Sequence, residues 1–448
     1  MNGDLTKGSV MKSMLLFAVP LILGNLLQQC YNIADTWIVG KYLGPNPLAA
    51  VGSAFTLMTF LTSIILGLCM GSGAYFSICF GQKDEKSMKE GMCASFVMIA
   101  LLTVVLNILV YVFIEEIGVF LNVPPEVWGD MKAYLSVIFL GIAATFFYNF
   151  FASLLRAVGN SVVPLIFLAF SAVLNIALDL VFILVLERGV AGAAEATVIS
   201  QYISGIGLAI FTWWRFPALR IGREHLRVKF HHIRTIMNFS GLTCLQQSVM
   251  NLGILMVQGR VNSFGPAVMT AFTAAVKIDA FAYMPVQDFG NAFSTFIAQN
   301  FGAKQDERIQ KGFKGAVLAS LAFCLFVSAV VFIFAENLMM IFIEKEETSI
   351  IAEGVRYLRI EGAFYFGIGF LFLLYGLYRA LGKPVMSLIL TVISLGTRVA
   401  LAYLLSAIPE IGVVGIWWSV PIGWMLADIT GFAVWFLMQK HLAKRGKM

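Results

Sequence analysis

Charge is scarce in this sequence. Asp, Glu, Lys and Arg together make up 12% of its 448 residues, whereas a soluble globular chain carries about 25%. Hydrophobic residues reach 59%, and the mean hydropathy is +0.86. This composition excludes an ordinary soluble protein and predicts an all-α polytopic membrane protein.

Motifs of soluble enzymes are also missing. There is no G-x-x-x-x-G-K-[ST] phosphate loop, so ATP is not expected to be the direct energy source, and there is no H-E-x-x-H or G-x-S-x-G motif. The six cysteines lack metal or redox spacing, and the four histidines lie outside the apolar segments. We therefore expect no enzyme activity and no cofactor. A cleavable signal peptide is not expected either, because no short apolar region is followed by a small-residue cleavage site.

Twelve long apolar segments can be recognised, and a helix needs about 20 residues to cross a bilayer. The segments are 11–39, 47–80, 88–113, 131–155, 161–186, 190–214, 233–259, 267–300, 313–335, 350–378, 384–406 and 412–439. They predict twelve transmembrane helices.

Lysine and arginine are distributed unevenly between the two ends of these segments. Most of the 31 basic residues fall on the side that also holds both termini, which the positive-inside rule places in the cytoplasm. The basic stretch 215–234 lies between two segments. It is therefore expected to face anionic lipid rather than nucleic acid.

The chain repeats itself at a nearly constant offset. Four motifs recur in order: Gln28-Gln29 as Gln246-Gln247, Phe80-Gly81-Gln82-Lys83 as Phe301-Gly302-Ala303-Lys304, Arg156-Ala157-Val158-Gly159 as Arg379-Ala380-Leu381-Gly382, and Gly189-Val190-Ala191-Gly192 as Gly412-Val413-Val414-Gly415. We predict two pseudo-symmetric six-helix bundles, 1–214 and 233–448, joined by a cytoplasmic linker at 215–232. Because six is even, the repeats are parallel, and a cleft between them could be exposed alternately to each side.

The first segment contains features that a simple anchor would not need. Pro20 removes a backbone hydrogen bond and bends the helix. Gln28, Asn32 and Asp35 share one helix face. A carboxylate at the centre of a span costs at least ~2.5 kcal/mol, so it usually marks an ion or substrate path. The alternative is that Asp35 reaches the interface or pairs with a lysine.

Segments five and six carry a second polar group. Asn175 and Asp179 are four residues apart, as are Thr197 and Gln201, so each pair shares a helix face. Carboxylate, amide and hydroxyl oxygens suit a proton or a sodium ion and offer nothing to a soft metal. Further polar residues are candidates for lining a substrate cavity: Gln28, Asn32, Asn149, Gln201, Gln247, Asn251 and Asp279. For Asp279, a structural pairing with Arg398 across the bundle is an equal alternative.

Together these residues resemble the multidrug and toxic compound extrusion (MATE) transporters, and the resemblance covers nearly the whole chain. It rests on Pro20 with Asp35, on Leu174-Asn175-Ile176 with Asp179, and on the stretch from Gly189 to Thr197. In the DinF-like prokaryotic branch, the matching residues form the cation site, here Asp35, Asn175, Asp179 and Thr197. Pro20 corresponds to the family's bending proline.

The resemblance implies a monomeric antiporter in a bacterial cytoplasmic membrane. It would export amphipathic, cationic organic compounds in exchange for inward H⁺ or Na⁺. Its partners would be small organic substrates and the lipid bilayer, with no nucleic acid. Na⁺ would bind at Asp35, Asn175, Asp179 and Thr197.

The second half departs from the NorM-like branch, which has acids in segments seven and ten. Segment seven has no acid, and segment ten has only Glu361, which is expected near its outer end. A NorM-like second-half site is therefore not expected. The alternatives are a lipid-linked precursor flippase of the wider superfamily, which should show a strongly cationic cleft, and an intramembrane enzyme, for which no nucleophile or metal set is visible.

Overall fold

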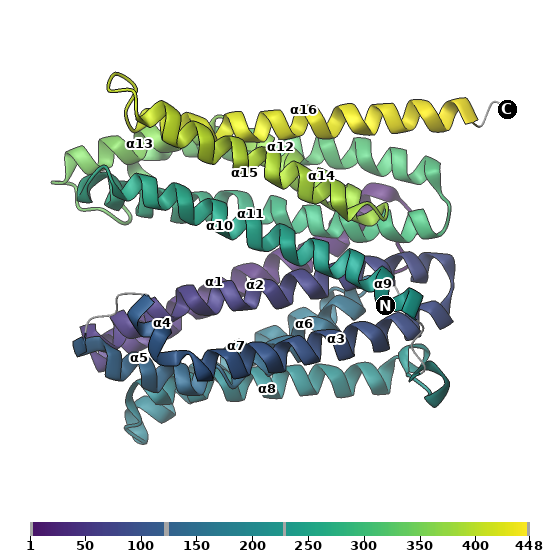
Figure 1. The fold of residues 1–448 in the computed structure, drawn as a ribbon, viewed down its shortest axis with the longest axis horizontal. Helices are drawn as coiled ribbons and strands as arrows, with labels where there is room; N and C mark the ends of the chain where they lie inside the picture. The colour runs from purple at the N-terminus through teal and green to yellow at the C-terminus, as the bar shows by residue number, and fades with distance from the viewer. Residues whose placement is uncertain (1–2, 121–124, 227–229, 446–448) are drawn as a thin grey trace. The chain divides into compact units, whose positions relative to one another are not determined.

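A computed structural model describes residues 3–120, 125–226 and 230–445, and this part of the chain is helical without strands (Figure 1). The helices of the first half are α1 (Val10–Leu43), α2 (Pro45–Gln82), α3 (Glu85–Val112), α4 (Ile114–Phe120), α5 (Pro125–Ile138), α6 (Gly141–Ala157), α7 (Val162–Leu180), the π-helical turn η1 (Val181–Val185) and α8 (Gly189–Arg215). The connection to the second half contains the 3₁₀ turns η2 (Pro217–Leu219) and η3 (Arg223–Leu226).

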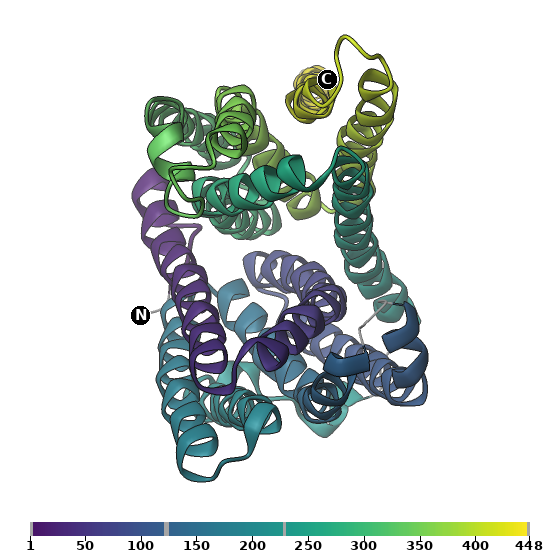
Figure 2. The same ribbon diagram turned by 90° about the vertical axis from the view of Figure 1, so that its left-hand side faces the viewer.

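The second half begins with α9 (Phe230–Ile236) and the π-helical turn η4 (Met237–Gly241). Its remaining helices are α10 (Leu242–Asn262), α11 (Pro266–Gly302), α12 (Asp306–Met339), α13 (Thr348–Gly362), α14 (Tyr365–Ala380), α15 (Pro384–Ser406) and α16 (Val414–Arg445). Figure 2 shows many of these helices nearly end-on, as is expected for helices that run in roughly the same direction.

Two compact units can be distinguished, and they do not follow the sequence halves completely. Unit 1 contains the N-terminal segment up to Gly8, residues 16–244 and residues 298–304. Unit 2 contains residues 9–15, 245–297 and 305 onward. The described part of the predicted linker 215–232 belongs to unit 1, and residues 227–229 lie outside the described residues.

Most of the predicted spans are long and apolar enough to cross a membrane. In the described part of the chain, nine single helices meet this condition, and two bent pairs raise the number to eleven. The pairs are α5 with α6, bent by 44°, and α13 with α14, bent by 51°. The remaining predicted segment corresponds to α9, η4 and α10, whose polar residues Thr243, Gln246 and Gln247 lower its hydropathy.

The backbone confirms the internal repeat independently of side chains. Of the ten described residues with positive φ, eight occur in matching pairs: Gly44 and Gly265, Lys83 and Lys304, Gly159 and Gly382, and Gly189 and Gly412. The two bent spans also occupy equivalent places in the two halves. The same turns and breaks have therefore been retained where the side chains differ.

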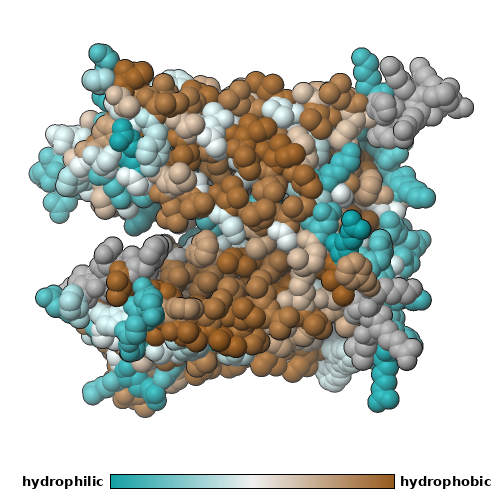
Figure 3. All heavy atoms as spheres, viewed as in Figure 1, coloured by the Kyte–Doolittle hydropathy of each residue, from teal (hydrophilic) through white to brown (hydrophobic). Residues whose placement is uncertain are grey.

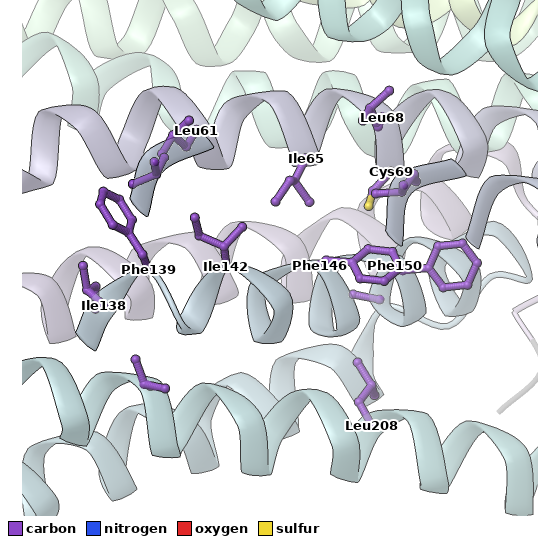
Figure 4. Packing of buried hydrophobic residues seen from close by; sticks show 14 of the residues in the cluster. Leu61, Ile65, Leu68, Cys69, Ile138, Phe139, Ile142, Phe146, Phe150 and Leu208 are labelled. Carbon is purple, nitrogen blue, oxygen red and sulfur yellow. The ribbon is translucent and has the colours of Figure 1, made fainter. Parts of the chain in front are cut away.

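The core of unit 1 lies between α2, α6 and α8. Figure 4 shows Phe146 and Phe150 of α6 pointing towards the helix that carries Ile65 and Cys69. The rings of Phe76 and Phe150 have centroids 6.1 Å apart in an edge-to-face arrangement. Burying each such aromatic side chain contributes about 2 kcal/mol or more. This packing holds α2, α6 and α8 together in unit 1.

The exposed sides of the helices are apolar. Figure 3 shows hydrophobic residues over the middle of the helices in this view and hydrophilic residues gathered near their ends. Exposed residues such as Leu101, Val173 and Phe326 contribute to this surface. Such a distribution is expected when lipid rather than water covers the sides of the helices.

Candidate functional site

Asp35 lies on the first helix, about two turns before its end. α1 continues to Leu43, eight residues or about 12 Å beyond Asp35, and the carboxyl is half-buried. α1 packs on α7 at Gly24, where a Cβ would lie 3.6 Å from the Leu168 side chain. Pro20 is buried inside α1 and leaves the Leu16 carbonyl without its usual helical donor.

Helices α7 and α8 bring the next two predicted residues together. The amide Nδ2 of Asn175 donates to Oγ1 of Thr197 at 3.2 Å, and this hydroxyl donates to the Ala193 carbonyl oxygen at 3.1 Å. Asn175 is 2% exposed. These bonds fix the amide so that its carbonyl oxygen, Oδ1, is buried and has no hydrogen-bond partner among the described residues.

Asp179 lies one turn after Asn175 and is fully buried. Its carboxyl and that of Asp35 are close enough to interact directly. Both oxygens of Asp179 and Oδ1 of Asp35 have no hydrogen-bond partner in the part of the chain that the structure describes. Two adjacent carboxylates repel each other, so a proton or cation held between them would stabilise the pair. The oxygens of Asp35, Asp179, Asn175 and Thr197 are the donor set that suits H⁺ or Na⁺.

Two tyrosines complete this environment, and the sequence analysis did not include them. The hydroxyl of Tyr31 lies beside the side chains of Gln28 and Gln201 and close to both acids. Tyr134 of α5 is 7% exposed and also lies near the two acids. Tyr31 could have been found, because it precedes Asp35 by four residues on the same face. Tyr134 had no such signal, since only the folded bundle brings α5 to this place.

The other predicted cavity residues in unit 1 are less closely connected. Asn32 is half-buried on α1, and its carbonyl oxygen accepts a bond from Thr36 of the same helix at 2.8 Å. Asn149 donates to the Thr145 carbonyl oxygen within α6 at 2.8 Å. No described contact ties Asn32 or Asn149 to the two acids. Glu195, unexplained by sequence, forms an ion pair with Arg188 at 2.7 Å.

Unit 2 contains a second buried polar group. Asp279 of α11 is 2% exposed and accepts a hydrogen bond from the Tyr365 hydroxyl. Its other neighbours include Glu361, Tyr357 and Arg398. The expectation that Glu361 lies near the outer end of its span is wrong: it precedes the break between α13 and α14, in the middle of the bent pair, and is 3% exposed. The acid of segment ten is therefore buried and lies near Asp279.

Two further predicted cavity residues and two basic residues also belong to unit 2. Gln247 and Asn251 of α10 are half-buried. Asp279 and Arg398 lie near enough to interact electrostatically, but no direct ion pair joins them within the described ranges. Lys277 lies with its Nζ 5.8 Å from the centre of the Phe342 ring.

Comparison with known proteins decides the family. The model of the MatE family matches residues 20–181 and 240–404. A protein of Bacillus subtilis (strain 168), named "Probable multidrug resistance protein YpnP", is 30% identical over 392 residues, which cover 87% of each chain. The chain belongs to the MatE family.

Solved structures of MATE proteins show the same fold. "Crystal structure of MATE in the bent conformation" superimposes with a TM-score of 0.93 at 24% identity and covers 100% of both chains. "Crystal structure of MATE in the straight conformation" has a TM-score of 0.90, also at 24% identity, and covers 99% of both. The predicted fold, twelve transmembrane helices in two bundles, is thus confirmed. This MatE protein is a multi-pass membrane protein, in which α9, η4 and α10 correspond to the seventh predicted span, 233–259.

Proposed function

We propose that this MatE protein exports amphipathic, cationic organic compounds across a bacterial cytoplasmic membrane in exchange for inward H⁺ or Na⁺. The observation that carries the proposal is the pair of interacting carboxyls of Asp35 and Asp179, most of whose oxygens have no hydrogen-bond donor. Buried, uncompensated carboxylates inside a membrane bundle are costly, so they are typical of ion paths. The name of the Bacillus relative, which refers to multidrug resistance, supports the choice of substrate.

The coupling ion binds where the two carboxyls meet. A proton would bridge them by a hydrogen bond, while Na⁺ would add the oxygens of Asn175 and Thr197 as ligands. Either ion neutralises part of the repulsion between Asp35 and Asp179. One positive charge that moves inward across 100 mV supplies ~2.3 kcal/mol, enough for a roughly fortyfold gradient of a neutral substrate. One-for-one exchange against a monovalent cation would cancel this electrical contribution.

Binding of the ion is proposed to alter α1, which carries both Asp35 and Pro20. The two residues are about four turns apart on one helix. A MATE relative has been solved in bent and in straight conformations. We propose that α1 of this chain also has two packings of similar energy and that occupancy at Asp35 selects between them.

The decisive experiment measures dye efflux from proteoliposomes under a proton gradient and a sodium gradient that are imposed separately. Efflux driven by at least one gradient is expected. Asp35→Asn and Asp179→Asn should each abolish it, while Glu116→Gln, an exposed acid, should retain full activity. Full activity in either Asn variant would refute the coupling site. Lipid-linked precursor movement without any gradient-driven dye efflux would favour the flippase alternative.

A further inference from the structure

The repeated Phe-Gly motif has no part in the proposed coupling site, yet it marks a very close approach of two helix ends. Gly81 lies in the last turn of α2, where an added Cβ would be 2.0 Å from the carbonyl oxygen of Gln299 in α11. Gly302, its counterpart in the repeat, would place a Cβ 2.1 Å from the carbonyl oxygen of Ile78 in α2. The contact is reciprocal, because Ile78 and Gln299 are also counterparts. All four residues belong to unit 1.

The N-terminal segment is held at the same place by its backbone. The amide N–H of Leu5 donates to Oε1 of Gln299 at 3.0 Å, and Nδ2 of Asn300 donates to the carbonyl oxygen of Leu5 at 3.2 Å. Leu5 is 3% exposed, and Gln299 and Asn300 are both fully buried. Two neighbouring side chains at the end of α11 therefore bind both polar groups of one residue of this segment.

Gln299 also reaches a third segment. Its Nε2 donates to the carbonyl oxygen of Ala157, the last residue of α6, at 2.8 Å. Gly159, in the turn that follows, has φ of +84° and lies so close to Gly3 that a Cβ on either residue would strike the other's carbonyl oxygen. One buried amide thus joins the N-terminal segment, the end of α6 and the end of α11.

Residues 3–8, here called the latch segment, also have local contacts of their own. The carboxylate of Asp4 accepts a bond from the Thr6 amide N–H at 3.0 Å and pairs with the Lys7 ammonium at 3.3 Å. Gly8 then turns the chain with φ of +74°, and α1 begins at Val10. The latch segment is consequently a turn attached directly to the helix that carries Pro20 and Asp35.

We propose that Gly81, Gly302, Gln299 and Asn300 form a gate. The gate lies on the same side of the membrane as the N-terminal segment, and the latch segment holds it closed by binding Gln299 and Asn300. The proposal rests on the proposed function, because alternating access requires each side to open in turn. The contacts suit a gate that opens: they are hydrogen bonds between neutral groups and a glycine contact, each of modest strength. They are also discrete, so the gate is either engaged or released.

The test uses single-methyl substitutions with a matched control on the same helix. Gly81→Ala and Gly302→Ala push a methyl group against a backbone oxygen. Gly52→Ala in α2 meets nothing within 4 Å. Each is combined with Leu5→Cys in a protein whose six native cysteines are replaced, and reaction with a maleimide is timed in proteoliposomes. Leu5→Cys retains the backbone bonds.

Gly81→Ala and Gly302→Ala are expected to raise the labelling rate roughly tenfold or more, as should Gln299→Leu, which removes two buried hydrogen bonds. Gly52→Ala should leave the rate unchanged. If the alanine variants do not fold, a second variant tests the latch segment. Deletion of residues 2–8 should raise the maleimide labelling rate of Ala157→Cys, because Ala157 is buried when the segment is in place. Equal labelling in gate and control variants would overturn the proposal.

Transport assays on the same variants separate this inference from the function on which it rests. If the labelling responds as expected but no variant, including the parent, exports dye, the gate stands and the proposed function fails. If dye export is driven by an ion gradient in the parent and is unchanged in Gly81→Ala, Gly302→Ala and Gln299→Leu, the gate is wrong.

Discussion

Nε2 of His232 lies 2.7 Å from Oε2 of Glu90, and both side chains are buried. The bond joins α9 to α3 in unit 1, and the Tyr75 hydroxyl approaches the other ring nitrogen at 3.3 Å. Gly71 of α2 touches the same region, since a Cβ there would be 2.4 Å from the Phe239 carbonyl oxygen. The beginning of the second half is therefore fixed to unit 1 before α10 continues into unit 2.

Removing this contact should destabilise the protein. His232→Ala leaves the Glu90 carboxyl buried without its partner, which should cost about 1–3 kcal/mol of unfolding free energy. Thermal unfolding in detergent would measure the loss, with His231→Ala as the control because His231 is exposed. An unchanged melting temperature for His232→Ala would show that the pair does not contribute to stability.

Thr197→Val should distinguish between the two coupling ions. The hydroxyl of Thr197 is a possible Na⁺ ligand but is not needed for a proton shared by Asp35 and Asp179. We expect the Na⁺ concentration for half-maximal efflux to rise about tenfold, a loss of about 1.4 kcal/mol, with little change in proton-driven efflux. Thr145→Val, whose hydroxyl bonds only the Gly141 carbonyl oxygen of its own helix, is the control. An equal loss of Na⁺-driven and proton-driven efflux would show that Thr197 stabilises the fold rather than binding Na⁺.

Pro20→Ala should favour a straight α1, because it restores the hydrogen bond to the Leu16 carbonyl oxygen. Efflux is expected to fall about tenfold or more while substrate binding survives. A cysteine placed near Gln28 should lose any dependence of its labelling on pH or Na⁺. Pro384→Ala serves for comparison, since a proline at the start of α15 removes no helical hydrogen bond. If Pro20→Ala transports normally and the labelling still depends on pH or Na⁺, the bend at Pro20 has a structural role only.

In unit 2, removing the charge of Glu361 should offset part of the stability lost when the charge of Arg398 is removed. Arg398→Met removes a positive charge that acts on the buried acids Asp279 and Glu361 without a direct ion pair, and should cost about 1–3 kcal/mol. Adding Glu361→Gln should recover a large part of this loss, which a double-mutant cycle of unfolding measurements would reveal. Arg356→Gln, at a mostly exposed position, should have little effect. Strict additivity of the two changes would contradict the coupling.

Asp84 should stabilise the start of α3 in a pH-dependent way. Its Oδ1 accepts a bond from the Ser87 backbone N–H at 3.0 Å, which lowers the pKa of the Asp84 carboxyl below its ordinary value of 3.8. The stabilisation is thus complete above the ordinary pKa and is lost as pH falls through the lower, folded value. Asp84→Ala should cost about 1 kcal/mol at pH 7 and progressively less in acid. A cost independent of pH would contradict this account, and Asp84→Asn should retain the cap throughout.

The fold was predictable because it depends on patterns that sequence records directly. Apolar length predicted twelve spans, eleven of which are matched by helices or bent pairs long and apolar enough to cross a membrane in the described residues. The spacing of short motifs predicted the repeat, which the left-handed turns at Lys83 and Lys304 also show in the backbone. Helical spacing also placed Asn175 and Asp179 on one face. These are local properties, and they survive folding unchanged.

The parts that were missed depend on contacts between distant segments. Tyr134 reaches the two acids only because α5 packs into the bundle. The position of Glu361 was predicted wrongly because no proline in the sequence indicates the break between α13 and α14. Gln299 and Asn300 read as ordinary polar residues at a helix end, and only the folded chain shows that they bind the backbone of Leu5.

Because residues 298–304 complete unit 1, the part of unit 1 that ends at Cys244 cannot finish its folding when its own synthesis ends. About 60 further residues must follow Cys244 before Gln299 and Asn300 can reach Leu5 and Ala157, a delay of several seconds at ~5–20 residues per second. During that interval the nascent bundle has exposed backbone groups around Leu5 and the end of α6. A first half expressed alone would remain in this unfinished state, and adding the end of α11 as a separate chain should complete it.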